Sequence, residues 1–84
     1  MKKIKYIEAY NNGYKIIDLS DAYEYKKSHL KNSINISYDD LIMNYRNYLN
    51  KNEKYYFYCN NGVKSKRAVI ILEYLGYEVT MVEK

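Results

Sequence analysis

The chain has 84 residues, 48% of them hydrophobic and 29% charged, and its formal net charge is +4 at pH 7. This length fits one small domain, because two independent cores need roughly twice as many residues. With one cysteine, Cys59, and one histidine, His29, the chain has no internal disulfide, and we expect no metal site. The longest apolar run, Ala68–Leu72, is far shorter than the roughly 20 residues of a membrane span. Met1–Tyr10 lacks a secretory signal pattern, so we expect a cytoplasmic protein with no membrane partner.

Strand and helix patterns alternate along the first half of the chain. In order, they predict strands over Ile4–Ala9 and Tyr14–Leu19, a helix over Ala22–Lys27, a strand over Ser33–Ile36 and a helix over Leu41–Leu49. Asn11-Asn12-Gly13 indicates a turn between the first two strands. Ser20 or Asp21 can cap the first helix, and Asp39-Asp40 opens the second.

The second half continues the alternation. Its patterns predict a strand over Tyr55–Tyr58, a polar loop over Cys59–Gly62, a helix over Lys64–Leu75 and a strand over Tyr77–Val82. The apolar residues that share one face of this helix are Ala68, Ile71, Leu72 and Leu75. Gly76 follows the helix where a left-handed cap is favoured. Strands alternating with helices predict an α/β fold with a mostly parallel sheet and helices on both faces.

Cys59 occupies a position that favours reactivity. It follows a predicted strand and leads through a tight loop into a helix, and ligands bind at this edge of open α/β sheets. We expect the free N–H groups of the helix start, together with Lys64, Lys66 and Arg67, to favour the thiolate. Gly62 lets the backbone fold close to the sulfur. An isolated cysteine can also be an inert buried residue, but this context favours a nucleophile.

Two blocks of the sequence resemble rhodanese-like sulfurtransferases. Cys-Asn-Asn-Gly-Val-Lys-Ser, Cys59–Ser65, resembles the active-site loop of that family: cysteine, two variable residues, glycine, a variable residue, a basic residue and serine. Upstream, Ile17–Tyr25, His29-Leu30 and Ile34–Ile36 resemble its first conserved block. Both blocks occur in the family's order and spacing, and the resemblance covers about Tyr14–Val82.

The resemblance implies a small five-stranded, mostly parallel sheet and a sulfurtransferase reaction without a cofactor. Cys59 would take a sulfane sulfur from thiosulfate or a persulfide, become a persulfide itself, and pass the sulfur to a thiol or other nucleophile. Its partners would be a small anionic sulfur donor or a persulfide-bearing protein, and a thiol acceptor. The residues expected to bind substrate are Asn60, Asn61, Gly62, Val63, Lys64, Ser65 and Arg67.

The chain departs from the family pattern at several positions. Ser20 stands where the family often has arginine, Ser28 where glycine precedes the histidine, and Ser37 where proline follows the strand. Asn32 replaces a turn glycine, which it can do because asparagine tolerates the left-handed region. At Lys84, where the chain ends, many members continue with a Gly-Gly motif and a further helix. This suggests a minimal domain or one that pairs with a partner.

Three other functions compete with this interpretation. A cysteine-based phosphatase or arsenate reductase would use a longer loop closed by arginine, whereas here the corresponding position is Ser65, and Arg67 comes two residues later. A non-catalytic sulfur carrier or protein-interaction module of the same fold is also consistent with the loop. Basic charge with many tyrosines could suggest RNA binding, but Tyr55–Tyr58 reads as a core strand, and we expect no nucleic-acid partner.

The remaining polar residues have structural interpretations. We expect His29 to bond the backbone and position its loop, and Asp18 to tie adjacent loops together. Lysines in the first strand would protect a sheet edge. Residues Lys51–Arg67 carry the whole net charge, since they hold five basic residues and Glu53. With Lys51 and Lys54 at the far end of a strand, the charge predicts a positive field around Cys59 that favours anionic donors or an acidic partner.

Overall fold

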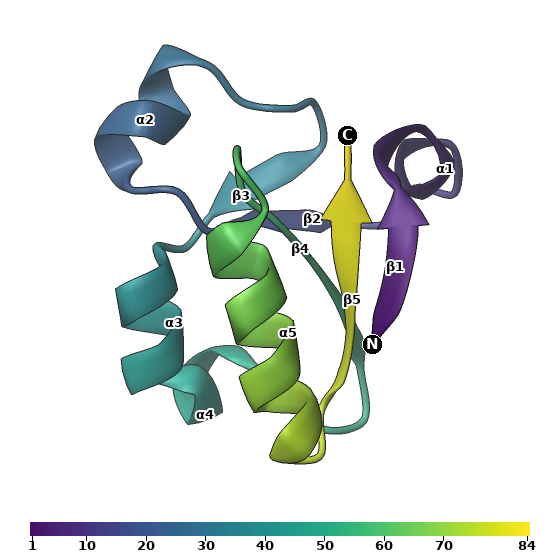
Figure 1. Ribbon diagram of the computed structural model, residues 1–84, viewed down its shortest axis with the longest axis vertical. Coiled ribbons are helices and arrows are strands. Elements are labelled where there is room, and N and C mark those ends of the chain that lie inside the picture. Colours follow the sequence, from purple (N-terminus) through teal and green to yellow (C-terminus); the bar gives the residue numbers. More distant parts are fainter.

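Five parallel strands form the centre of the structure, in the order β1-β5-β4-β2-β3 (Figure 1). The computed structural model describes residues 1–84. Its elements are β1 (Lys2–Lys5), α1 (Tyr6–Asn11), β2 (Ile16–Asp18), α2 (Ala22–Lys27), β3 (Ser33–Asn35), α3 (Tyr38–Met43), α4 (Tyr45–Tyr48), β4 (Lys54–Tyr58), α5 (Val63–Tyr74) and β5 (Glu78–Glu83). Every strand pair is parallel, so the predicted α/β fold with a parallel sheet is confirmed.

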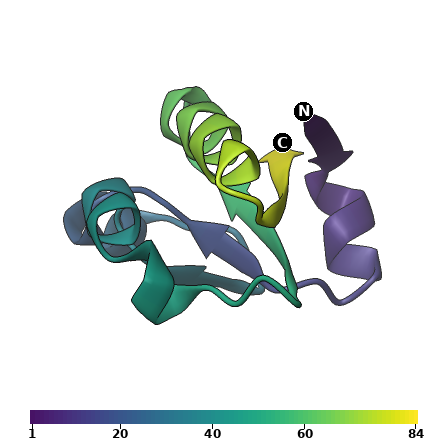
Figure 2. The same cartoon turned by 90° about the horizontal axis from the view of Figure 1, so that it is seen from below.

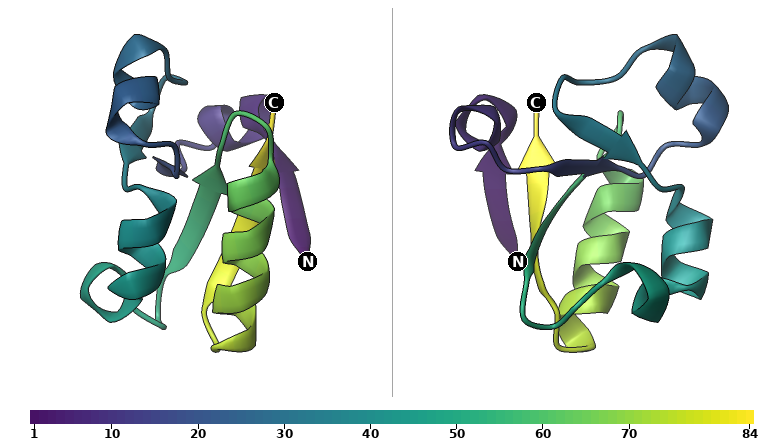
Figure 3. Two further views of the ribbon diagram at one scale, coloured as in Figure 1. Left: turned by 60° about the vertical axis from the view of Figure 1, so that its left-hand side comes forward. Right: turned by 180° about the vertical axis from the view of Figure 1, so that it is seen from behind.

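Helices cover both faces of the sheet, as Figures 2 and 3 show. On one face, α3 and α5 pack on the sheet over the larger core, whose fully buried members include Leu41, Phe57 and Leu72. On the other face, α1 covers a smaller core that contains Ala9 and Tyr58. None of the helices combines the length and apolar character that a membrane crossing requires.

The predicted strand over Ile4–Ala9 is wrong beyond its first residues. The chain leaves β1 after Lys5 and forms α1, which buries Ala9 completely. Parallel strands cannot be joined by a tight hairpin, because the chain must cross over the sheet before it enters the next strand. The turn at Asn11–Gly13 therefore connects a helix to β2, with Gly13 at a φ of +72°.

The predicted helix over Leu41–Leu49 is two short helices. α3 begins earlier than expected, with Ser37 as its cap, and it ends before Asn44. Asn44 has a non-helical backbone, φ −131° and ψ 30°, and its amide donates to the backbone oxygen of Asp40 at 3.2 Å. An asparagine side chain that bonds the local backbone competes with helical hydrogen bonds, so the helix breaks here.

Other elements agree with the sequence-based expectations. α2 spans the predicted residues, and the Asp21 carboxylate caps it by accepting from the Glu24 N–H at 2.9 Å. Asn32 adopts the left-handed region at a φ of +66°, and Gly76 at +97° ends α5. β1 is an edge strand, and its Lys2 and Lys3 pair with carboxylates of β5.

Candidate active site

Cys59 immediately follows β4, the middle strand of the sheet, and is 4% exposed. The chain then reverses, because the Gly62 N–H donates to the Cys59 carbonyl at 3.4 Å, and α5 begins one residue later. Gly62 has a φ of +78°, and a Cβ added there would lie 3.2 Å from Cε of Met81. Both the backbone conformation and the close approach require glycine at this position.

The loop folds around the Cys59 sulfur. The backbone N–H of Ser65, in the first turn of α5, donates to Sγ at 3.2 Å, and the Ser65 hydroxyl lies 3.5 Å from it. Asn61 Oδ1 lies 3.7 Å from Sγ and also accepts from the Val63 N–H at 3.0 Å. The expected contact between the helix start and the sulfur is thus made by a single residue, Ser65, which is fully buried.

Cys59 lines a small cavity of about 50 Å³. Its lining residues are Ser20, Glu24, Cys59, Asn60, Asn61 and Lys64. Four of these were predicted site residues, whereas Ser20 and Glu24 were not. Ser20 lies in the segment between β2 and α2, and Glu24 lies in α2. Both come close to Cys59 because Asp18 pairs with Tyr58, so the residues that follow these two strands meet at one edge of the sheet. This proximity depends on the order of the strands in the sheet. The sequence analysis did not give that order, so it did not predict Ser20 and Glu24 as residues of the cavity.

Two further predicted site residues, Val63 and Arg67, do not line this cavity. They line a shallow depression of about 280 Å³ on the outer face of α5, together with Lys66, Ile70 and Ile71. Of the three cations predicted near the sulfur, only Lys64 lines the cavity. Lys66 points about 200° around the helix from Lys64, and Arg67 lies nearly one turn further from the loop.

Carboxylates lie close to the site. Asp18 is 1% exposed, and its Oδ1 accepts from the Ser20 N–H at 2.8 Å. Burial raises the pKa of Tyr58, and the charges of Asp18 and Cys59 add to this effect. The pKa of Asp21 is held below its ordinary value, chiefly by the Glu24 N–H and in part by the charge of Lys64. The surroundings of the cavity are thus not uniformly positive.

The comparisons with known proteins agree with this geometry. The sequence model of the rhodanese-like domain matches residues 4–84. The chain belongs to the rhodanese-like domain family. Similar solved structures include a rhodanese-like domain protein from Staphylococcus aureus, with 33% identity, a TM-score of 0.85, and coverage of 99% of this chain and 85% of that one.

Two further structures are similar to this rhodanese-like domain. A rhodanese-related protein from Thermoplasma volcanium has 29% identity and a TM-score of 0.85, with 99% of this chain and 84% of that chain covered. A protein from Staphylococcus saprophyticus has 27% identity and a TM-score of 0.86, with 99% and 87% covered. No curated protein gave a significant match to the sequence.

The histidine of this rhodanese-like domain lies outside the Cys59 cavity. His29 Nδ1 is 2.8 Å from the Tyr25 backbone oxygen, and the two rings stack with their centroids 3.9 Å apart. This confirms its predicted contact with the backbone. Asn35 ties β3 to the segment before α2, because its amide donates to the backbone oxygens of Asp18 and Ser20 at 3.0 and 2.9 Å.

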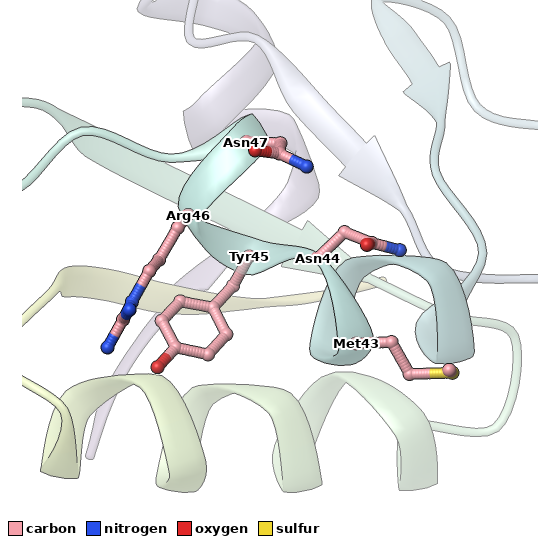
Figure 4. Close-up of a pocket in the computed structure, with 5 residues that line it drawn as sticks. All are labelled: Met43, Asn44, Tyr45, Arg46 and Asn47. Carbon is pink, nitrogen blue, oxygen red and sulfur yellow. The ribbon is translucent and has the colours of Figure 1, made fainter.

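Larger cavities lie away from the cysteine. One of about 310 Å³ is formed by Met43–Asn47 where α3 meets α4, and the side chains of Tyr45 and Arg46 point toward α5 (Figure 4). Its lining contains no thiol, imidazole or carboxylate. Another, of about 590 Å³, lies beside the tyrosines Tyr14, Tyr55 and Tyr56. Neither cavity shares a residue with the Cys59 cavity.

Proposed function

We propose that this rhodanese-like domain is a sulfurtransferase with Cys59 as its nucleophile. The proposal rests on one observation: the sulfur of the buried Cys59 accepts a hydrogen bond from the Ser65 N–H at 3.2 Å, and Cys59 lines a small cavity. A backbone donor at a helix start stabilises negative charge on sulfur before and after it accepts a second sulfur atom.

The reaction consists of two displacements at sulfur. The Cys59 thiolate attacks the outer sulfur of thiosulfate, a new S–S bond forms, the donor S–S bond breaks, and sulfite leaves with the electron pair. A thiolate acceptor then attacks the outer sulfur of the Cys59 persulfide and releases the original thiolate. No net oxidation occurs, because the sulfane sulfur keeps its state through both steps. Splitting the transfer in this way is covalent catalysis.

The size of the cavity supports transfer of a single atom. A water molecule takes up about 30 Å³ in the liquid. A cavity of about 50 Å³ therefore has room for one or two groups of the size of a water molecule, which suits one sulfur atom on Cys59. A larger donor, including a protein persulfide, would present only its terminal sulfur. We propose a thiol as the acceptor.

The position of Arg67 argues against the phosphatase and arsenate reductase alternatives. Recognition of a phosphate-like anion relies on an arginine fork that contacts two of its oxygens. None of the residues lining the Cys59 cavity is an arginine, and Arg67 lines the depression on the outer face of α5. The single cation at the cavity, Lys64, acts as a point charge rather than a fork.

Sulfur loading tests the proposal. Purified protein incubated with thiosulfate or a persulfide should gain the mass of one sulfur atom, and cyanide should remove it as thiocyanate over many cycles. Cys59→Ser should abolish both signals. Its urea unfolding midpoint should stay close to that of the wild type, because serine and cysteine are similar in size. Intact protein that gains no cyanide-removable sulfur from either donor would contradict the proposal. Loading without repeated turnover would favour the non-catalytic carrier.

A further inference from the structure

The side of α5 that faces away from the sheet carries apolar residues. The buried residues of α5 are Ser65, Ala68, Val69 and Leu72. Val63, Ile70 and Tyr74 are 52%, 51% and 90% exposed, and at about 100° per residue they centre roughly 170° away from the buried face. No other element covers this side of α5 (Figures 1 and 2). A surface helix is ordinarily polar where it meets solvent, so the fold of one copy does not account for these residues.

Three charged residues of α5 lie beside these apolar side chains, and none of them has a charged or aromatic partner in the chain. Lys66, Arg67 and Glu73 are exposed, and all three are absent from the ion pairs and cation–ring contacts of the structure. Val63 and Ile70 line the depression of about 280 Å³ together with both cations. We call this surface the outer stripe; its residues are Val63, Lys66, Arg67, Ile70, Glu73 and Tyr74. Exposed apolar surface with charges at its rim is typical of a protein–protein contact.

The outer stripe is nearly symmetrical about Ile70. Lys66 and Glu73 are seven positions apart, so they lie on one side of the stripe, within about 20° of each other. Arg67 and Tyr74 are also seven positions apart and lie together on its other side. Along the helix axis, one member of each pair lies about 4.5 to 6 Å before Ile70 and the other lies about 4.5 to 6 Å after it. Each cation thus has its complement at the opposite end of the stripe, on the same side.

We propose that the outer stripe is the interface of a homodimer, in which two copies of α5 pack antiparallel about a two-fold axis at Ile70. Such an axis reverses the direction of the helix but keeps its sides, so matching sides meet with their ends exchanged. Lys66 then meets Glu73 of the partner subunit, with about 1.5 Å between their positions along the axis. Arg67 meets the ring of Tyr74 of the partner subunit, a favourable cation–π geometry. A parallel pair would instead set Lys66 against Arg67 of the partner subunit.

The size of the outer stripe predicts a weak dimer. α5 has 12 residues and is therefore about 18 Å long, so one helix pair buries less than the roughly 1,200 Å² of a stable interface. We expect a dissociation constant of roughly 0.1 to 1 mM, with the chain monomeric at about 10 μM. Because the stripe carries a carboxylate between its cations, it suits a second copy better than a uniformly acidic surface. Cys59 lies outside the stripe, so the dimer does not depend on sulfur chemistry.

Charge reversal in two separate variants tests this dimer by sedimentation equilibrium. The mass of the wild type should rise from 10.2 kDa at about 10 μM toward twice that value at about 1 mM. Lys66→Glu and Glu73→Lys each set two pairs of like charges across the axis, so each alone should raise the dissociation constant about tenfold or more. An equimolar mixture of the two variants should restore it to within about threefold of the wild-type value, because every facing pair is again opposite in charge.

Matched variants elsewhere on the surface serve as controls. Lys26→Glu on α2 and Glu8→Lys on α1, at exposed positions, should dimerise like the wild type, alone and mixed. Ile70→Ser should abolish the dimer, whereas Ile7→Ser, at an isoleucine on α1 that is 62% exposed, should leave it unchanged. A wild type that stays monomeric at about 1 mM would overturn the dimer and leave the stripe to a different protein. A mixture of Lys66→Glu and Glu73→Lys that dimerises no better than its components would overturn the antiparallel pairing.

Discussion

At the scale of single residues, the site depends on two backbone features next to Cys59. Ser65 brings its N–H to the sulfur, and this requires the loop to reverse tightly enough for α5 to start at Val63. Gly62 makes the reversal possible, because it holds a left-handed φ of +78° close to the side chain of Met81. The geometry of the sulfur is therefore set by neighbours within six positions of Cys59.

Gly62→Ala should destabilise the protein by about 1–3 kcal/mol, because alanine strains the left-handed backbone and its Cβ meets Met81 at 3.2 Å. Gly13→Ala is a matched control, since Gly13 has a similar φ of +72° but nothing within 4 Å of the added Cβ. Urea unfolding should show the larger loss for Gly62→Ala, and only this variant should also lose sulfur loading. Equal losses in both variants would show that the contact with Met81 contributes nothing.

At the scale of elements, α2 carries Glu24 to the cavity although it buries none of its own residues. Two polar contacts, one at its start and one further along, hold it in position. The Asp21 cap bonds Glu24 N–H at 2.9 Å, and the Tyr25 hydroxyl donates to the backbone oxygen of Ser33. A helix held in this way responds to the ionisation of its cap.

The depressed pKa of Asp21 predicts a loss of stability in acid. A carboxylate with a lower pKa in the folded protein contributes stability above its unfolded pKa, and this contribution disappears as the pH falls through the folded value. Asp21→Asn keeps a capping side chain but does not titrate. Between about pH 5 and 3, the urea midpoint of the wild type should therefore fall more than that of Asp21→Asn. Parallel pH curves for the two proteins would contradict the role of the ionised cap.

At the scale of the whole molecule, two cores of unequal size share one sheet. The larger core, under α3 and α5, contains Phe57 with no exposed surface, while the smaller one lies under α1. The basic side chains are also spread over separate parts of the molecule. Lys51 lies over Tyr77 at the end of α5 remote from the cysteine, at 5.5 Å from the ring centroid, and Lys66 and Arg67 face outward. The net charge of +4 is thus not concentrated at the site.

Phe57→Ala should cost about 3–5 kcal/mol, because it leaves a cavity at the centre of the larger core. A domain of this size is stabilised by roughly 4–13 kcal/mol in total, so the variant should be close to unfolding at 37 °C. Tyr74→Ala, at a tyrosine that is 90% exposed, should change stability by less than about 0.5 kcal/mol. Thermal unfolding followed by circular dichroism distinguishes the two variants, and similar transitions in both would show that the larger core is not the main source of stability.

Several elements could be predicted from local pattern, and others could not. The sequence predicted α2, β4, α5 and β5, because the residues of each fit either a helix or a strand pattern. These elements also have clear caps or boundaries, such as Asp21 and Gly76. α1 was missed because its short stretch has strand-like residues, and only the crossover between parallel strands makes it a helix. The break at Asn44 depends on a side-chain contact with Asp40 that periodicity does not reveal.

Cys59 and its loop could be predicted from the sequence alone, because Cys59 to Ser65 are contiguous and their conformation follows from local rules for strand ends, glycine and helix starts. The opposite wall of the cavity was decided by the tertiary structure. Glu24 lines the same cavity as Cys59 because β2 and β4 are neighbours, whereas Arg67, further along α5, lines a different depression. The number of charged residues in a sequence does not show where their side chains lie, and the electric field at the sulfur depends on those positions in space.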